Sequence, residues 1–265
     1  MTAYKNQSLE RGFAILEFLG KSTTGHSVSE VARATKLHRA TAHRLLEVLC
    51  QLGYAYKAAD RRYWFGYSMH VFGHRTNMVA RITHHAHPFL VKLAHEVDET
   101  VNLGFLEGIQ AFVADRVVTA QAHRSDVQIG GYFDAHATSL GKALLSSRTP
   151  EEVNASYKAT RLASYTGSTI TDQKTLSREL ADVRKRGYAV NYEERSPGIR
   201  SVAAPLINPH GRAACAISIT GPRARLGDAR IPRLGARLQE IAREIVEHLT
   251  AQGGVVPSAN RTGAA

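Results

Sequence analysis

The chain has 265 residues, of which 43% are hydrophobic and 22% are charged. This balance is typical of a folded protein with a substantial apolar core, so it argues against general disorder, and the length allows one large domain or two ordinary ones. The 34 Lys and Arg exceed the 23 Asp and Glu, and the formal charge of +11 favours a polyanionic partner. Charge alone does not exclude a basic protein that has no such partner.

The cysteines and the hydropathy pattern bear on location. Cys50 and Cys215 lie far apart, in segments with helix and strand patterns, so free buried thiols in a reducing compartment are the simplest account. No run approaches the roughly 18 apolar residues of a membrane span, and the polar start lacks a signal-peptide core. We therefore expect a cytoplasmic protein with no membrane contact.

The first 68 residues carry the pattern of three helices and a hairpin. Ser8 is placed to cap a first helix that ends near Gly20, and Ser27 and Glu30 form a capping box for a second. After a third helix, the aromatic-rich runs YAYKAA and RYWFG within residues 54–66 predict a β-hairpin. Three helices followed by a hairpin make a winged helix.

The third predicted helix, HRATAHRLLEVL over residues 38–49, separates an apolar face from a basic one. Ala42, Leu45, Leu46 and Leu49 recur at i, i+3, i+4 and i+7, which predicts one buried stripe. The opposite face is small, basic and rich in hydrogen-bond donors near the start of the helix. A capped helix, a short turn and a second helix of this kind are typical of a helix-turn-helix whose second helix enters the DNA major groove.

The candidate DNA contacts lie at the start of this helix and at the hairpin tip. Residues 1–68 hold ten Lys or Arg against five Asp or Glu, nearly half of the excess charge in a quarter of the chain. Guanidinium groups can pair with guanine or hold phosphates, and a hairpin tip can reach the backbone or the minor groove. The predicted contacts are Arg39, Ala40, Thr41, His43, Arg44, Arg61 and Arg62. For each arginine, and for Lys57, the alternative is a solvated surface charge.

Residues 69–97 carry a further helical pattern, in which Pro88 is expected to start a new segment or to kink the helix. This connector is a place where two chains could pair. It is crowded with histidines, namely His70, His74, His84, His85, His87 and His95. His70 and His74 could share a helix face as zinc-binding pairs do, which makes a metal sensor the alternative interpretation. Because no Cys or close carboxylate completes the set, we expect no metal and no other cofactor.

The rest of the chain alternates strand and helix patterns. Strands are predicted at residues 100–106, 109–118, around 127–133, 188–192, 199–207 and 213–220. Helices are predicted after a cap at Thr138 or Ser139, over 172–186 with an end at Gly187, and over about 228–250. Strands flanked by helices indicate an α+β domain of about 170 residues, distinct from the first 68.

Motifs from both halves resemble one family. SLERGFAILEFL, SVSEVARATKLHRATAHRLLEVLCQLGY and RYWFG are similar to the DNA-binding half of the isocitrate lyase regulator (IclR) family of bacterial transcription factors. HATSLGKALL, RGYAVNYEE and GIRSVAAPLINPHGRAACAISITGP resemble its second half, so the resemblance covers roughly residues 8–250. It implies a winged helix-turn-helix at 8–68, a linker helix at 69–82, a GAF-like mixed α/β effector-binding domain at 83–250 and a flexible tail at 251–265. It also implies a homodimer, or a dimer of dimers, on a palindromic double-stranded DNA operator.

Four positions depart from the family pattern. Lys36 stands in the turn where Gly is usual, so a residue with a Cβ has to accept φ > 0 at a modest cost. His38 and Ala40 replace Pro and Ser, and the second change removes a hydroxyl that could touch DNA. Asn191 stands where Asp is common, which removes a charge near the expected ligand. The fold is unaffected, but the operator sequence and the ligand stay open.

The resemblance places the effector between the loop before residue 139 and the last strands. Ser201, Ser218 and Thr220 offer hydroxyls there, and the helix that begins at 139 offers N–H groups and a positive dipole end suited to a carboxylate. A small organic acid is expected, and an aromatic one if Tyr132 and Phe133 stack on a ring. The positions carried over are Phe133, Ala135, Ser139, Leu140, Asn191, Ile199, Ser201, Ser218 and Thr220. The alternative is hydroxyls paired within the sheet and aromatic rings in the core.

The residues give no catalytic pattern: we find neither a nucleophile with a base nor a cofactor loop. Glu193 and Glu194 are adjacent, so on a strand they would point to opposite faces and could not share a proton. We therefore expect a ligand-responsive transcriptional regulator and not an enzyme. The residues do not distinguish a repressor from an activator.

Overall fold

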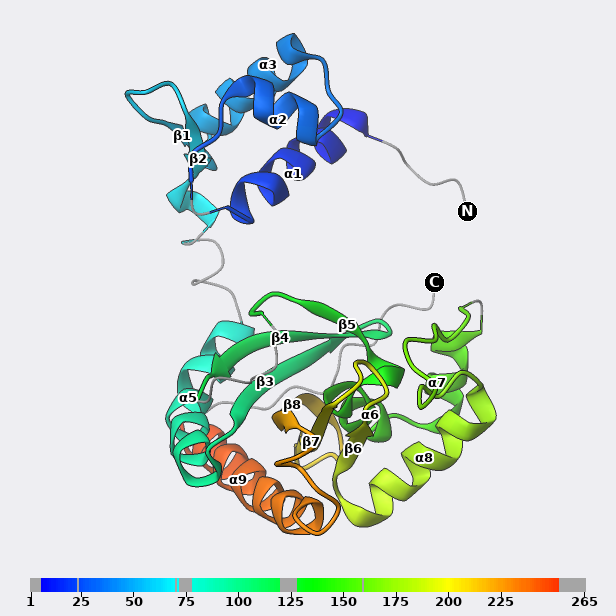
Figure 1. Cartoon of the computed structure of the whole chain (residues 1–265). Helices are drawn as coiled ribbons and strands as arrows, with labels where there is room; N and C mark the ends of the chain where they lie inside the picture. The colour runs from blue at the N-terminus through cyan, green and yellow to red at the C-terminus, as the bar shows by residue number, and fades with distance from the viewer. Residues whose placement is uncertain are drawn as a thin grey trace. The chain divides into compact units, whose positions relative to one another are not determined.

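The computed structural model describes residues 6–22, 24–69, 71, 78–119, 128–158 and 160–252. The chain divides into two compact units, Met1–Met78 and Val79–Ala265, each with its own core (Figure 1). None of the helices within these ranges is both long and apolar enough to span a bilayer. Most of the tail expected at 251–265 lies outside the described residues.

The first unit contains the three helices and the hairpin that the sequence predicts. Its elements are α1 (Gln7–Gly20), α2 (Val28–Ala34), α3 (Arg39–Gln51), β1 (Ala55–Lys57) and β2 (Tyr63–Phe65). The stripe predicted for α3 is buried at Ala42, Leu46 and Leu49, and Leu45 packs against the same core. Because α1, α2 and the hairpin close over this stripe, α3 presents its basic face outward.

The start of α1 differs from the prediction. Asn6, not Ser8, is the N-cap, and its Oδ1 accepts a hydrogen bond from the Leu9 N–H at 3.2 Å. Ser8 lies inside the first turn, so its hydroxyl is not in the capping position. The apolar face of α1 is buried only in its second half, because Leu9 and Phe13 are 59% and 53% exposed.

The helix-turn-helix itself follows the sequence closely. The predicted capping box is present: the Ser27 N–H donates to Glu30 Oε2 at 2.7 Å, and the Glu30 N–H donates to Ser27 Oγ at 3.3 Å. In the turn, Lys36 has φ of 54°, as expected for a residue in the place of a glycine. The Leu37 N–H then donates to the Ala32 carbonyl oxygen at 2.9 Å and closes the turn.

The second unit is built on a six-stranded antiparallel sheet with the order β5-β4-β3-β8-β7-β6. The strands are β3 (Thr100–Glu107), β4 (Gln110–Val117), β5 (Tyr132–Asp134), β6 (Ala189–Tyr192), β7 (Ile199–Ile207) and β8 (Ala213–Pro222). The helices are α5 (Met78–Val97), η1 (Ala135–Ala137), α6 (Ser139–Ser146), α7 (Pro150–Tyr157), α8 (Gln173–Arg186) and α9 (Ile231–Ala251). The α+β class is therefore confirmed. Only α7 is missed among these α-helices, although its capping box at Thr149 and Glu152 was a usable signal.

The two faces of the sheet are covered by different helices. α5 and α9 pack on one face, whereas α6 and α8 lie on the other (Figure 1). In β8, Ile217 and Ile219 enter the core under α5 and α9, and Ala216 enters the core under α6. Since successive side chains alternate between faces, Ser218 and Thr220 also face α6. This alternation decides which residues can meet beside α6.

α5 is longer than the linker helix expected at 69–82. It runs from Met78 to Val97 as one helix with Pro88 inside it, so Pro88 does not start a new segment. Buried Ala86, Leu90 and Leu93 hold the helix against the sheet on both sides of the proline, which offsets its lost hydrogen bond. Residues 67–69 and 71 are helical as well, while the other predicted linker positions up to 77 lie outside the described residues.

Lys36→Gly should stabilise the first unit by up to about 1 kcal/mol, because glycine reaches φ > 0 without the penalty that a Cβ brings. Urea unfolding followed by the fluorescence of Trp64, the single tryptophan, reports on this unit. Lys36→Ala is the matched control: it removes the charge but keeps a Cβ, so its free energy of unfolding should stay within about 0.5 kcal/mol of wild type. If Lys36→Gly is no more stable than Lys36→Ala, the positive φ at position 36 does not strain the backbone.

Candidate DNA-binding surface and ligand cavity

The exposed face of α3 carries most of the predicted DNA contacts. Arg39, Ala40, His43 and Arg44 are exposed, and Thr41 is half-buried beside them. They lie in the first two turns of the helix, opposite the buried stripe. The helix therefore offers two guanidinium groups and an imidazole on a surface that a DNA groove could approach.

A hydrogen-bonded group fixes α3 to the hairpin. The buried Tyr63 donates its hydroxyl to Glu47 Oε1 at 2.6 Å, and Lys57 Nζ lies 3.2 Å from the same oxygen. The Tyr63 hydrogen bond, followed by Lys57, lowers the pKa of the Glu47 carboxyl. His43 Nε2 lies 3.5 Å from Glu47, so this carboxylate also orients one of the predicted DNA contacts. Lys57 thus pairs with Glu47 inside the first unit and is not simply a solvated surface charge.

The two hairpin arginines differ in their contacts. Arg61 is exposed at the tip, where φ is 63°. Arg62 donates from Nη1 to the Gly25 carbonyl oxygen at 2.7 Å, and its backbone N–H donates to Asp60 Oδ1 at 3.0 Å. Arg62 therefore ties the hairpin to the loop before α2, although its side chain is still about half exposed. Arg61 is the better placed of the two to reach outward.

The second unit contains a cavity of about 220 Å³ between the start of α6 and strands β3, β4 and β6–β8. Eight of the nine residues carried over from the family line it, together with residues that the sequence analysis did not assign to the ligand. The eight are Phe133, Ser139, Leu140, Asn191, Ile199, Ser201, Ser218 and Thr220. The structure thus brings together residues that lie up to 87 positions apart in sequence.

Ala135 is the exception. It lies in η1 and is fully buried, but its side chain belongs to the core under α7 and α8 and does not line the cavity. The reason is the close packing of η1 on α6: a Cβ added at Gly141 would lie 2.2 Å from the Ala135 Cα. The backbone of Ala135 faces α6, so its methyl group points the other way.

A polar row crosses the sheet under α6. Asn102 on β3 pairs with Ser218 on β8, and Thr220 on β8 pairs with Ser201 on β7. Ser201 in turn pairs with Asn191 on β6. Antiparallel register and two-residue alternation together place all five side chains on the cavity face. All five are at least 90% buried, so their hydrogen bonds matter.

The hydroxyls of this row are partly paired within the sheet, as the alternative interpretation expected. Asn102 Nδ2 donates to Ser218 Oγ and Thr220 Oγ1, each at 3.3 Å, and Ser139 Oγ donates to Ser201 Oγ at 2.7 Å. In each pair the hydroxyl on β7 or β8 accepts. Each of these hydroxyls therefore keeps its own proton for donation.

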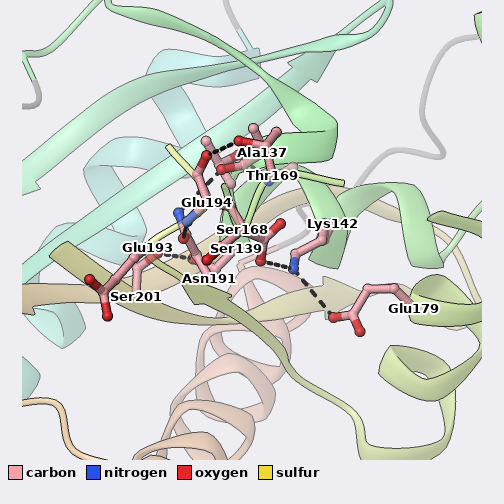
Figure 2. Close-up of polar contacts among 12 residues, drawn as sticks. Ala137, Ser139, Lys142, Ser168, Thr169, Glu179, Asn191, Glu193, Glu194 and Ser201 are labelled. Carbon is pink, nitrogen blue, oxygen red and sulfur yellow. Dashed lines mark hydrogen bonds and ion pairs between the residues drawn. The ribbon is translucent and has the colours of Figure 1, made fainter. Parts of the chain in front are cut away.

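Asn191 is a structural link as well as part of the cavity wall. Its Nδ2 donates to the Ala137 carbonyl oxygen at 3.2 Å, and its Oδ1 accepts from the Glu194 N–H at 2.7 Å (Figure 2). An amide satisfies both partners, whereas an aspartate would set an anion against the Ala137 carbonyl. The departure from the family's Asp thus suits a role in joining β6 to η1.

A buried ion pair fastens α6 to the turn after β6. Lys142 is 1% exposed and lies 2.6 Å from Glu194 Oε1 and 3.3 Å from Glu179 Oε1 on α8 (Figure 2). Burial raises the pKa of the Glu194 carboxyl, and Lys142 opposes that shift. Thr169 Oγ1 donates to the Glu194 carbonyl oxygen at 2.6 Å and holds the same turn from a second side.

Arg195 follows this turn and was missed by the sequence analysis. Its guanidinium carbon lies 4.1 Å from the centroid of the Tyr165 ring and 5.9 Å from that of Phe133. The Tyr165 hydroxyl donates to Asp134 Oδ2 at 2.6 Å, which fixes the ring under the arginine. No periodicity marks an arginine in a turn as part of a cavity, so only the folded chain reveals it.

Comparisons with known proteins address both units. A family model described as the IclR helix-turn-helix domain matches residues 8–59, and one described as bacterial transcriptional regulator IclR C-terminal matches residues 74–247. The chain belongs to the IclR family of bacterial transcriptional regulators. The resemblance inferred from the motifs is therefore confirmed, and the first unit contains the DNA-binding helix-turn-helix domain of an IclR regulator.

Relatives support this assignment over nearly the whole chain. The acetate operon repressor of Salmonella typhimurium is 34% identical over 242 residues, which is 90% of this chain and 88% of the relative. The crystal structure of Thermotoga maritima IclR matches with a TM-score of 0.75 and 31% identity over 91% of this chain and 98% of the other. An IclR homologue from Microbacterium hydrocarbonoxydans, complexed with 4-hydroxybenzoate, matches with a TM-score of 0.82 and 25% identity over 92% and 100%.

Four of the connector histidines, His84, His85, His87 and His95, lie in the described residues. Within the described part of this IclR regulator, no group of three or more His, Cys, Asp or Glu residues is arranged to hold a metal ion. His84 and His248 both lie with their ring centroids 5.4 Å from that of His85, and His87 pairs with Asp115 at 2.7 Å. The pair that prompted the metal interpretation, at positions 70 and 74, lies outside the described residues.

Lys142→Met should lower the free energy of unfolding by about 3–5 kcal/mol, because it leaves the buried Glu194 without its cation. Guanidinium unfolding followed by circular dichroism measures the loss. Glu194→Gln in the Lys142→Met background should recover a large part of it, since the neutral amide removes the unpaired charge. If Lys142→Met alone lowers the free energy of unfolding by less than about 1 kcal/mol, the ion pair does not hold α6 to the turn after β6.

Proposed function

We propose that the cavity binds a small organic acid that controls DNA binding by this IclR regulator. The proposal is carried by one observation: three residues with hydroxyl groups, Ser201, Ser218 and Thr220, line the same cavity as Arg195. Such donors, together with the N-terminal end of α6, complement an anion. The volume is below the roughly 300–1,000 Å³ of pockets for drug-sized ligands, so the ligand is small.

An aromatic acid is the favoured form. The Microbacterium homologue was crystallised with 4-hydroxybenzoate, and this cavity has apolar walls at Phe133, Leu140 and Ile199. Tyr132, the other ring suggested by the sequence, is 52% exposed and does not line the cavity. Phe133 is therefore the aromatic side chain that would contact a ligand ring.

For DNA we propose that α3 enters the major groove of a palindromic operator. Arg39 and Arg44 would read guanine or hold phosphates, with Thr41 and His43 beside them and Ala40 in contact with the groove wall. Arg61 would reach the backbone or the minor groove, and Arg62 would contribute less because it is tied to Gly25. A homodimer, or a dimer of dimers, acting in the cytoplasm, where bacterial DNA lies, completes the proposal. Two of the relatives that match over most of the chain are named repressors, which favours repression.

Arg44→Ala should weaken operator binding by about 1–3 kcal/mol, which is roughly 5- to 150-fold in Kd. The operator is first selected from a random duplex library with the wild-type protein, and affinity is then measured by fluorescence anisotropy at fixed salt. Arg178→Ala is the matched control, because Arg178 is an exposed arginine on α8 of the other unit. If the wild type and the Arg44→Ala variant bind the operator with equal affinity, Arg44 does not contribute to DNA binding.

An acid that binds the cavity should change operator affinity. A thermal-shift screen of small carboxylic acids finds ligands, because binding to the folded state raises Tm. Each hit is then titrated into the protein–operator complex. Linkage requires the operator to change the acid's affinity by the same factor, so the coupling is measured in both directions. A hit that raises Tm but leaves operator affinity unchanged would contradict an effector role.

A further inference from the structure

Among the described residues of the cavity wall, two buried polar atoms have no hydrogen-bond partner. Within the described residues, Asn102 Oδ1 receives no donor and Arg195 Nε finds no acceptor. Both residues line the cavity. A buried polar group that is left unpaired destabilises its surroundings, so each atom marks a place where a ligand gains affinity by completing the bond. One place needs a donor and the other needs an acceptor.

The acceptor is needed at Arg195. Along the wall formed by described residues, Arg195 is the one charged side chain, so a negative group on the ligand would meet no competing anion there. Tyr165 lies against the guanidinium at 4.1 Å, which limits its motion before a ligand arrives. A planar guanidinium donates to a carboxylate in fixed geometry, and such charge-assisted bonds are stronger than neutral ones.

The donor is needed at Asn102. Its Nδ2 donates to both Ser218 and Thr220, and Oδ1, which can only accept, is left without a donor among the described residues. A carboxylate placed here would set its lone pairs against Oδ1. A hydroxyl suits the place better, because it can donate to Asn102 Oδ1 and accept from a neighbouring serine or threonine hydroxyl.

We propose that the effector is a hydroxy acid: its carboxylate pairs with Arg195, and its hydroxyl donates to Asn102 Oδ1. The hydrocarbon part lies against Leu140 and Ile199, which line the same cavity. This inference rests on the proposed function and adds to it the chemical class of the ligand and the two residues that select it. Acids without a hydroxyl leave Asn102 unpaired, and alcohols without a carboxylate leave Arg195 unpaired.

Matched ligand pairs test the proposal on the unmodified full-length protein. Isothermal titration calorimetry is run with benzoate and 4-hydroxybenzoate, butyrate and 4-hydroxybutyrate, and propionate and 3-hydroxypropionate, with phenol as the probe that lacks a carboxylate. In at least one pair we expect the hydroxy acid to bind about tenfold or more tightly than its partner, because only it completes the bond to Asn102. Binding of acids without any preference for the hydroxyl would overturn this inference alone. Failure of every acid to bind would count against the proposed acid effector itself and overturn both.

Variants then assign the two ends of the bound ligand. Arg195→Gln should weaken both members of the preferred pair by the same factor, about tenfold or more, and keep the preference for the hydroxyl. Asn102→Leu should abolish that preference and leave the acid without the hydroxyl within about twofold of wild type. Asn102→Asp keeps an acceptor at this position, so it should retain the preference at lower overall affinity, and it serves if the leucine variant does not fold. Arg178→Gln is the control, with unchanged affinities expected. Retention of the preference in a folded Asn102→Leu variant would overturn the role of Asn102.

Discussion

The antiparallel register of β3, β8 and β7 is the constraint on which the second unit depends. Asn102 pairs with Ser218 and Ser201 pairs with Thr220, and the residues between them, such as Ile219, enter the core under α5 and α9. A shift of one residue in any of these pairings would turn the hydroxyls into the apolar core and apolar side chains into the cavity. The same alternation of polar and apolar residues along these strands therefore specifies the core on one face of the sheet and the cavity on the other.

α6 completes the cavity because two contacts hold it close to the sheet and to η1. Gly141 allows the backbone of η1 to approach, since any side chain there would meet Ala135. One position further along, Lys142 reaches Glu194 and Glu179 in a buried group that costs desolvation and is retained by its mutual pairing. The wall of the cavity thus depends on residues that do not line it, and substitutions of those residues should affect ligand binding through position.

Much of this arrangement could be predicted from the sequence, and the parts that could not have physical reasons. The apolar stripe of α3, the capping box at Ser27 and the strand alternation of β8 are local signals, so they were found. The positive φ of Lys36 was predicted because the family has Gly there. Asn102 and Arg195 were missed: a single Asn in an apolar strand and an Arg in a turn acquire meaning only from neighbours distant in sequence.

Hydrogen bonding inside the cavity changes which atoms decide ligand selectivity. The sequence directed attention to the hydroxyls of Ser201, Ser218 and Thr220, yet each already accepts a bond from within the protein. Each accepts one bond and keeps its own proton, so these hydroxyls favour ligand acceptors in general without distinguishing one acid from another. Ligand selectivity therefore depends on the unpaired atoms, Asn102 Oδ1 and Arg195 Nε, because a ligand gains most affinity where a buried group would otherwise stay unpaired.

The turn after β6, which Lys142 holds through Glu194, also carries Arg195. A ligand that binds both Arg195 and the start of α6 therefore adds a further link between two elements that the ion pair already joins. A bound acid can shift the equilibrium of the regulator only by its difference in affinity between two conformations, and this shared link is where such a difference would arise.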